Sequence, residues 1–389
     1  MKILVLTDLF PEPANPNHGI FIYQWAKHLS QKVDLTVLQT VWTTKQQLLT
    51  SESLEIFRKN FSNYSDQFIW RQIPIKIPYY DRLWLRALFF HHSVKKYFKK
   101  YLNDFDLLIG QMGVPGGFVA VKLACQYNKK TIVGLRGSDV TSYPFQPILR
   151  RMVLWTYRRA DILVTVSNDL RQKLIDLDFD SSKIEVIHNG IDSFFSPLPK
   201  TEARRYLNLS NTRIIIFIGY LIARKDWLTL IEGVKIFSQI TACKCYLIGT
   251  GEDRLLIEKK IRDEKIEDRI ILIGNVAHHV LKYWYNAADV LCLPSKREGI
   301  PNVVLESFAC GIPVVASNIA GNCEIVKEGK NGYLFNVGDK QSLVKSLQKV
   351  FEMKWNPDII VNSVRNFTWQ KNTLDYIRII KNLHNITGH

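Results

Sequence analysis

The stretch "VLCLPSKREGIPNVVLESFACGIPVVAS", Val290 to Ser317, holds two short apolar runs separated by a polar loop and a longer segment. The runs at Val290 to Leu293 and Pro313 to Ala316 have the length and β-branched content of buried strands. Between them, Pro301 favours a helix start, because proline is well tolerated at the first helical position. The stretch therefore predicts a strand–helix–strand unit of a parallel sheet.

The same alternation of strand-like and amphipathic segments runs through both halves of the chain. The strands expected in the first half are Ile3 to Thr7, Asp34 to Leu38, Leu107 to Ile109, Thr131 to Leu135, Ile162 to Val166 and Ile184 to Ile187. Those expected in the second half are Ile214 to Ile218, Cys245 to Ile248, Ile270 to Ile273, Val290 to Leu293, Pro313 to Ala316 and Gly332 to Phe335. Between the two series, "NGIDSFFSPLPK" indicates a linker. We expect two doubly wound α/β domains, with ligands beyond the carboxyl ends of the strands.

The composition agrees with two folded domains and indicates an anionic partner. The chain has 389 residues, 47% of them hydrophobic, and a formal net charge of +16. Such a charge suits nucleic acid, anionic lipid or a phosphorylated small molecule. The six cysteines form no C-x-x-C pair and have no histidines at zinc-ligand spacing, so we expect a reducing cytosol, no disulfide framework and no metal site. We also expect no signal peptide and no transmembrane segment.

Two glutamates, Glu298 and Glu306, lie on either side of the expected helix start, with seven residues between them. A helix N-terminus offers free N–H groups and the positive end of the helix dipole, which suit a diphosphate or sugar hydroxyls. A carboxylate before the helix and another inside it can accept hydrogen bonds from the hydroxyls of a sugar nucleotide. The alternative is that both are solvated charges near a helix end, and the pair alone leaves both interpretations open.

This stretch resembles the donor-binding signature of glycosyltransferase family 4, in which E-x7-E is followed by a helix of small residues and "G-x-P-V-V-A-S". Further family landmarks follow in order: "DLLIGQMGVPGG", "TIVGLRGSDV", "VTVSNDL" and "VIHNGID", then "FIGYLIARKDWLTLIEG", "LIGTGEDR", "AADVLCLPS", "AGNCEIVKEGKNGYLF" and "FTWQ". The resemblance implies the GT-B fold, two Rossmann-like domains facing across a cleft. It implies an acceptor-side domain at 1–195, a donor-binding domain at 196–369, and a C-terminal helix at 370–389 that crosses back onto the first domain.

The resemblance also implies a donor site. Lys225, in "ARKDW", corresponds to the family's lysine that contacts the donor diphosphate, a role that suits a compact ammonium group. Glu306 would hold the ribose, and Glu298 would hold the sugar together with the loop that follows it. The full set of donor-binding residues implied is Gly19, Lys225, Gly299, Ile300, Pro301, Asn302 and Glu306, with Gly19 in the first loop.

On the acceptor side, the resemblance implies that Arg136, in "LRGSD", lies nearest the transferred sugar, so that Arg136 and Glu298 are the catalytic candidates. Many relatives have histidine at the positions of Gln111 and Arg136, and arginine at that of Tyr220. A guanidinium can still stabilise the charge on a departing diphosphate. Gln111, Asp139 and Asn189 are further candidate substrate contacts, although Asp139 is equally suited to cap the following helix.

The activity implied is a retaining, metal-independent transfer without a cofactor, from a UDP- or GDP-linked sugar to a glycan or polyprenyl-linked acceptor. The "LRGSD" motif resembles the branch of teichuronic acid and surface-polysaccharide glycosyltransferases. Two alternatives share the fold: a catalytically degenerate nucleotide-sugar-binding protein, suggested by Tyr220, Gln111 and Arg136, and a GT-B epimerase. A nucleic-acid binder is supported by net charge alone, because no binding module is recognisable.

One basic segment is relevant to where the protein is located in the cell. The stretch "YYDRLWLRALFFHHSVKKYFKKYL", residues 79–102, has six basic residues and a single acid, Asp81, interleaved with aromatic residues. A basic amphipathic helix with interfacial aromatics suits an anionic membrane surface. The alternative is a helix whose apolar face packs on the core and whose basic face is solvated. We expect a cytoplasmic protein, peripheral on the inner face of the cell membrane.

Overall fold

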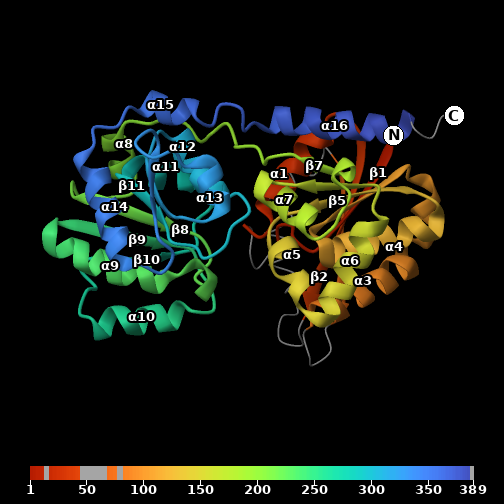
Figure 1. Cartoon of the computed structure of the whole chain (residues 1–389), viewed down its shortest axis with the longest axis horizontal. Helices are drawn as coiled ribbons and strands as arrows, with labels where there is room; N and C mark the ends of the chain where they lie inside the picture. The colour runs from red at the N-terminus through yellow and green to blue at the C-terminus, as the bar shows by residue number, and fades with distance from the viewer. Residues whose placement is uncertain (13–16, 44–67, 77–81, 386–389) are drawn as a thin grey trace. The chain divides into compact units, whose positions relative to one another are not determined.

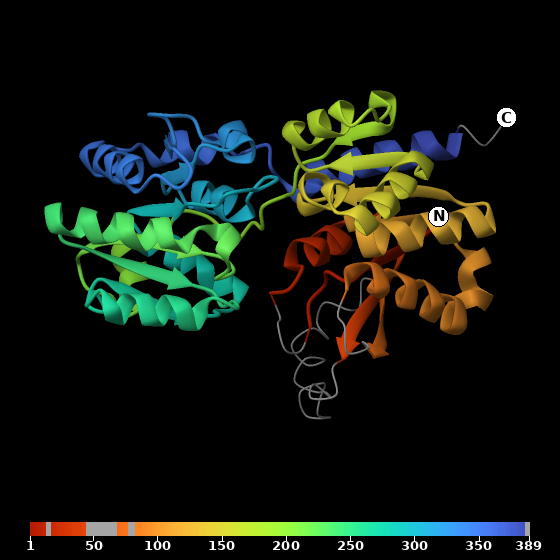
Figure 2. The same ribbon diagram turned by 60° about the horizontal axis from the view of Figure 1, so that its bottom comes forward.

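The computed structural model describes residues 1–12, 17–43, 68–76 and 82–385, which form two compact units (Figure 1). Unit 1 comprises Met1–Gly190 and Trp369–His389, and unit 2 comprises Ile191–Thr368. Each unit contains one parallel sheet with helices around it (Figure 2). The two doubly wound parallel-sheet domains predicted from the sequence are confirmed.

Unit 1 is built on a seven-stranded sheet of order β3-β2-β1-β4-β5-β6-β7. Its strands are β1 (Lys2–Thr7), β2 (Asp34–Thr43), β3 (Ile69–Lys76), β4 (Leu107–Gln111), β5 (Lys130–Leu135), β6 (Ile162–Thr165) and β7 (Ile184–Val186). Its α-helices are α1 (Ile20–Leu29), α3 (Leu83–Phe98), α4 (Phe118–Tyr127), α5 (Ser138–Thr141), α6 (Pro147–Arg159), α7 (Asn168–Asp176) and α16 (Trp369–Asn385). The strand order reverses between β1 and β4, where such sheets bind ligands.

Both faces of this sheet are buried, which is why its strands are almost continuously apolar. In β1, Leu4 and Leu6 pack into the cluster with α3, α4 and α6, whereas Ile3 and Val5 pack into the cluster with α1 and α16. The C-terminal helix α16 joins the second cluster through Tyr376, whose ring meets that of Trp25 edge to edge at 5.2 Å. The chain therefore returns at its C-terminus to complete the core of unit 1 (Figure 1).

Unit 2 is built on a six-stranded sheet of order β10-β9-β8-β11-β12-β13. Its strands are β8 (Arg213–Ile218), β9 (Cys243–Ile248), β10 (Ile270–Gly274), β11 (Val290–Leu293), β12 (Val314–Ser317) and β13 (Gly332–Phe335). Its α-helices are α8 (Lys200–Tyr206), α9 (Trp227–Ile240), α10 (Arg254–Asp263), α11 (Leu281–Ala287), α12 (Asn302–Ala309), α13 (Ala320–Ile325), α14 (Lys340–Glu352) and α15 (Pro357–Asn362).

The stretch from Val290 to Ser317 forms β11, α12 and β12, and β11 pairs with β12 in parallel. Pro301 is the extended residue that precedes α12, so the helix begins one residue later, at Asn302. Every strand expected from the sequence is present. One strand was missed: β3, which pairs with β2 at the edge of the sheet and contains Pro74. Proline is confined to such edge positions because it cannot donate to the ladder.

The basic segment 79–102 contains α3 and continues into a 3-10 turn at Lys99–Asp104; residues 79–81 lie outside the described part of the chain. Helix α3 buries a stripe made of Ala87, Phe90, Val94 and Phe98 and exposes Lys96. The predicted amphipathic helix is confirmed, and its apolar stripe belongs to the core of unit 1. None of the described helices is long and apolar enough to cross a membrane.

Candidate active site

The residues predicted to bind the donor diphosphate and sugar meet at the carboxyl edge of the unit 2 sheet. Lys225 ends the short turn after β8, and Glu298 lies in the loop after β11, the strand next to β8. The Lys225 ammonium donates to Oε1 of Glu298 at 2.6 Å, and Nη1 of Arg224 lies 3.5 Å from Oε2 of the same carboxylate. The side chains of Lys225 and Glu298 are only 10% and 12% exposed, so this is a nearly buried ion pair.

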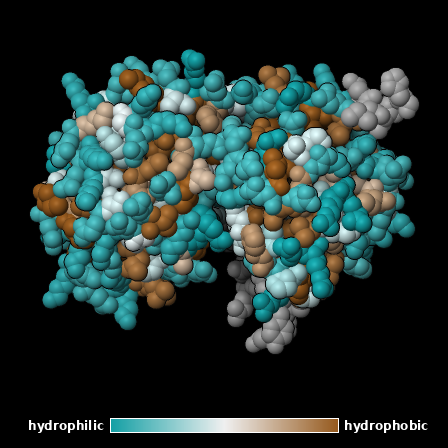
Figure 3. All heavy atoms as spheres, in the orientation of Figure 1, coloured by the Kyte–Doolittle hydropathy of each residue, from teal (hydrophilic) through white to brown (hydrophobic). Residues whose placement is uncertain are grey.

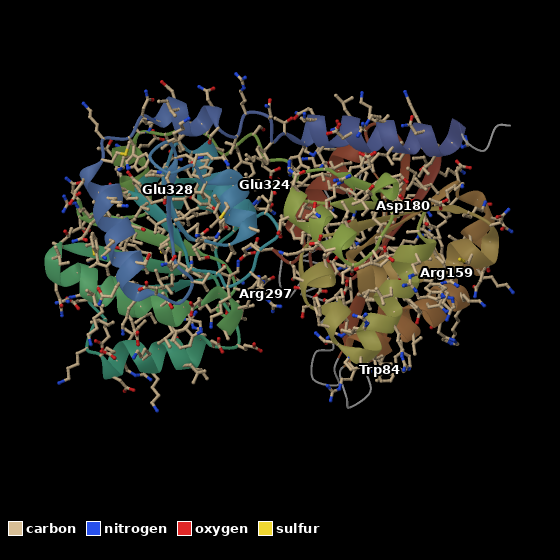
Figure 4. All side chains as sticks on the ribbon, viewed as in Figure 1. Trp84, Arg159, Asp180, Arg297, Glu324 and Glu328 are labelled. Carbon is tan, nitrogen blue, oxygen red and sulfur yellow. The ribbon has the colours of Figure 1, made fainter. Side chains whose placement is uncertain are left out.

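The charge of Glu298 is set by its neighbours. Burial alone would raise the pKa of this carboxyl, but the positive charges of Lys225 and Arg224, with a hydrogen bond from Lys225, hold the pKa below its ordinary value. Glu298 is therefore a carboxylate near neutral pH. Arg297, next to it, is exposed and is visible at the surface in Figure 4.

The loop from Gly299 to Asn302 is fixed by close packing of backbone on backbone. Gly299, Ile300 and Pro301 are buried, and Asn302 begins α12. A Cβ at Gly321, in α13, would lie 2.0 Å from the carbonyl oxygen of Gly299, so only glycine fits there. This contact holds the loop between Glu298 and the first turn of α12, and a helix N-terminus favours negative charge.

Glu306, the predicted ribose ligand, is held from two sides. The hydroxyl of Tyr285, in α11, donates to its Oε2 at 2.6 Å, and Nε2 of His278 lies 3.5 Å from its Oε1. His278, whose side chain is 16% exposed, lies between two carboxylates. His279 is exposed. The cue in the sequence was the position of His278 just beyond the carboxyl end of β10.

In unit 1, the candidate residues Gln111, Arg136 and Asn189 meet beyond the carboxyl ends of β4, β5 and β7. Arg136 donates from Nη2 to Oε1 of Gln111 at 2.7 Å and from Nη1 to Oδ1 of Asn189 at 2.6 Å. Its guanidinium also lies over the ring of Phe21, in α1, at 5.6 Å. The amides of Gln111 and Asn189 are neutral, so they orient the cation without neutralising it.

The Asp139 carboxylate connects the loops next to the Arg136 guanidinium. Its carboxylate is fully buried and accepts hydrogen bonds from the backbone N–H groups of Gly113, Arg136 and Gly137. Burial raises the pKa of Asp139, and these hydrogen bonds lower it, with burial the larger effect. Gly137, not Asp139, is the residue that precedes α5. The carboxylate thus ties the turn after β4 to the turn after β5, and its contact with substrate stays a prediction.

Gly19 precedes α1 in a left-handed conformation, with φ 60°. A Cβ there would lie 2.3 Å from the carbonyl carbon of Leu9, so glycine is required by the packing of the first loop. Residues 13–16 of this loop lie outside the described part of the chain. Within the described ranges, no three His, Cys, Asp or Glu side chains are grouped as a metal site would need. None of the six cysteines, all of which lie in the described part of the chain, forms a disulfide.

Two family models match this chain, one in each half. The model described as Glycosyltransferase Family 4 matches residues 19–193, and the model described as Glycosyl transferases group 1 matches residues 199–381. The boundary between the two matches falls close to the boundary between unit 1 and unit 2.

The individual proteins to which this chain is similar are consistent with the two family matches. The chain is 25% identical to TuaC of Bacillus subtilis (strain 168), named as a teichuronic acid biosynthesis glycosyltransferase, over 92% of each chain. It is 27% identical to the N-acetyl-alpha-D-glucosaminyl L-malate synthase of Bacillus anthracis, but this match spans only 58% of that relative and 55% of this chain. The crystal structure of Anabaena HepE in complex with UDP has the same fold, with a TM-score of 0.77 at 19% identity over 98% of this chain and 100% of that one.

The likeness of fold confirms the GT-B architecture, since the solved neighbour spans both units. The family models confirm the resemblance carried by the E-x7-E stretch and by the landmarks along both halves. The chain is therefore an enzyme, a glycosyltransferase, and it belongs to glycosyltransferase family 4.

Proposed function

We propose that this enzyme transfers a hexose from a UDP-linked donor to a glycan or polyprenyl-linked acceptor in bacterial surface-polysaccharide synthesis, with retention of anomeric configuration. The observation that carries the proposal is the nearly buried Lys225–Glu298 pair in front of α12, together with Glu306 inside that helix. The UDP bound to HepE supports the choice of base, and the name of TuaC supports the polysaccharide.

In unit 2, side chains are available to bind the diphosphate and the ribose of the nucleotide-sugar donor. An ammonium has three N–H donors, so Lys225 can keep its bond to Glu298 and still donate to a phosphate oxygen. Arg224 lies 3.5 Å from the same carboxylate and adds a second positive charge. This charge compensates for the arginine that many relatives have at the position of Tyr220. Glu306, held by Tyr285, presents a carboxylate to the ribose hydroxyls, and the first turn of α12 favours negative charge.

The chemistry requires charge stabilisation more than a nucleophile. Glu298, paired with Lys225, is a poor candidate for a covalent intermediate, so we assign departure and attack on one face of the sugar. The bond from the anomeric carbon to the diphosphate breaks, the acceptor oxygen bonds to that carbon, and the acceptor's proton passes to the diphosphate. The role we assign to Arg136, following the family's pattern, is to stabilise the developing negative charge, in the manner of an oxyanion site.

A thermal-shift panel with UDP, GDP, ADP and CMP tests the donor assignment. A ligand at 100 times its Kd stabilises the folded state by about 2.7 kcal/mol, which raises the melting temperature of a unit of this size by roughly 2 to 4 °C per kcal/mol. We expect UDP alone to shift the transition of unit 2. A shift with GDP instead would correct the base, and no shift with any nucleotide at millimolar concentration would contradict the donor site and the nucleotide-sugar-binding alternative alike.

Changing Glu306 to alanine is expected to weaken UDP binding about 10- to 100-fold, because a hydrogen bond to a charged group contributes about 1.5 to 3 kcal/mol. Titration calorimetry with UDP measures the effect. Glu267→Ala is the matched control, since this exposed glutamate lies before β10, at the opposite edge of the same sheet. Equal UDP affinities for wild type and Glu306→Ala would contradict the assignment of the ribose site.

The exposed face of α3 supports a contact with an anionic membrane. Leu88, Phe89 and Tyr97 are 42%, 38% and 59% exposed, next to the exposed Lys96, Lys99 and Lys100. Helix α6 packs beside α3 and carries further exposed arginines, among them Arg159. Figure 4 labels Trp84, of α3, and Arg159 on unit 1. Figure 3 shows that hydrophilic side chains cover most of the visible surface and that apolar residues are interspersed among them.

The triple change of Lys96, Lys99 and Lys100 to glutamine is expected to weaken binding to phosphatidylglycerol vesicles about 100-fold, since each basic residue contributes about 1 kcal/mol at such a surface. Vesicle co-sedimentation, with phosphatidylcholine vesicles for comparison, measures it. Changing the exposed Lys330, Lys345 and Lys354 of unit 2 in the same way is the control. Unchanged binding of the α3 variant would refute the membrane contact.

A further inference from the structure

His278 connects three segments of unit 2 beside the predicted ribose ligand. Its Nε2 lies 3.5 Å from Oε1 of Glu306, in α12, and its Nδ1 lies 3.5 Å from Oδ2 of Asp192, in the segment after β7. The edge of the imidazole meets the rings of Phe194 and Phe195, with centroids 5.4 and 5.3 Å away. These contacts hold the ring between the two carboxylates.

Glu306 is therefore restrained at both of its oxygens. Tyr285 donates to Oε2 at 2.6 Å, and its ring packs edge-on against Phe195 at 5.6 Å, so this donor is itself held in place. The side chains of Glu306 and Asp192 are only 12% and 9% exposed. A carboxylate held in this way is preorganised for a ligand, because less conformational freedom is lost on binding.

The charge of His278 decides whether its ring can donate hydrogen bonds to both carboxylates. Only the imidazolium can donate from both ring nitrogens, one to Asp192 and one to Glu306; the neutral ring donates to one and turns a lone pair toward the other. Burial would lower the pKa of His278, but the hydrogen bond and charge of Glu306, with the charge of Asp192, hold the pKa above its ordinary value. Burial first, then Glu306, raises the pKa of the Tyr285 hydroxyl far out of the physiological range, so it remains a donor.

We propose that His278 is a positioning residue for the donor: as an imidazolium it holds the Glu306 carboxylate toward the nucleoside and offsets the negative charge of Asp192 and Glu306 beside an anionic ligand. This inference rests on the proposed function, which assigns the ribose to Glu306. The consequence is a donor affinity that depends on pH. Affinity is at its maximum while His278 is protonated and falls as the pH rises through the raised pKa of His278.

The test is the Kd of UDP between pH 5.5 and pH 9, measured by calorimetry on the full chain for the wild type and for His278→Gln, His278→Arg and His279→Gln. The terminal phosphate of UDP also ionises in this range, but this contribution cancels between variants. His279 is the matched control, because it is the exposed neighbour on the same turn.

We expect His278→Gln to bind UDP about 3- to 10-fold more weakly than the wild type at pH 6, with a flatter pH profile. His278→Arg keeps a positive charge, so it should recover affinity at pH 6 and lose the decline at high pH. His279→Gln should match the wild type. In turnover, the KM for the donor should rise in His278→Gln while kcat stays nearly constant, which a general loss of folding would not produce.

Two kinds of failure are distinguishable. If Glu306→Ala weakens UDP binding and His278→Gln keeps the wild-type affinity and pH profile, the proposed function stands and the role of His278 is refuted. If Glu306→Ala itself leaves UDP affinity unchanged, the ribose assignment fails, and the inference about His278 fails with it. Melting curves without nucleotide show whether each variant is folded at the temperature of the titration.

Discussion

Replacing Lys225 by methionine is expected to lower the free energy of unfolding of unit 2 by about 3 kcal/mol, because it leaves the Glu298 carboxylate without its main partner. Breaking a buried ion pair by removing one partner costs about 3 to 5 kcal/mol. The lower value applies here, since Arg224 lies 3.5 Å from the same carboxylate and compensates in part. Urea unfolding monitored by circular dichroism measures the change.

The double variant Lys225→Met with Glu298→Gln isolates the cause. Removing both charges should restore most of the lost stability, whereas a loss that persists would mean that Lys225 acts through packing. Lys296→Met is the control: this lysine is 52% exposed and pairs with Asp226 at 3.6 Å, and such pairs contribute at most about 1 kcal/mol. Full stability of Lys225→Met would contradict the account of the pair.

The Lys225–Glu298 pair also makes the free energy of unfolding depend on pH. The folded pKa of Glu298 lies below its ordinary value, so the unfolded chain binds a proton more readily at this residue. The stabilisation is therefore present above the ordinary glutamate pKa, about 4.3, and is lost as the pH falls through the folded pKa. Lys225→Met should weaken this dependence below pH 5.

Replacing Arg136 by alanine is expected to lower kcat about 100- to 1,000-fold, the range seen when one stabilising donor is removed from a developing negative charge. The Kd of the UDP-hexose should change less than kcat, because the negative charge that Arg136 is proposed to stabilise is fully developed only as the diphosphate departs. UDP release from its hexose conjugate gives kcat, and calorimetry gives the Kd.

Arg136→Lys separates charge from geometry. Lysine keeps the positive charge but lacks the planar fork that bonds two amide oxygens at once, so we expect an intermediate kcat. Alanine also removes the hydrogen bonds that Arg136 donates to Gln111 and Asn189, at a cost of about 1 to 3 kcal/mol in stability. Melting curves of both variants check that the enzyme is folded at the assay temperature. An unchanged kcat with a weakened Kd would reassign Arg136 to donor binding.

The sequence predicted most of the fold because parallel strands covered on both faces are continuously apolar. β1 and β11 illustrate this: each is a short run of buried residues ended by a polar loop. β3 escaped prediction because Arg71 and Gln72 interrupt its apolar residues and because it contains Pro74, which is typical of an edge strand and not of a central one.

The sequence predicted the candidate site residues, but not their contacts. Lys225 and Glu298 are 73 residues apart, and their pairing depends on β8 and β11 being neighbours in the sheet. The meeting of Gln111, Arg136 and Asn189 depends in the same way on where β4, β5 and β7 end. The partnership of His278 with Asp192 and Glu306 required a helix, a turn and the segment after β7 to converge, which no local pattern records.

The most direct measurement is mass spectrometry of the products formed when the full chain is incubated with UDP-hexoses and a lipid extract from the source cells. The account predicts that UDP is released and that a lipid-linked glycan gains the mass of one hexose, with wild-type enzyme and not with Arg136→Ala. A UDP-hexose that binds but is recovered unchanged with every acceptor fraction would contradict transfer and indicate a degenerate protein. A sugar altered without any acceptor would contradict it in favour of an epimerase.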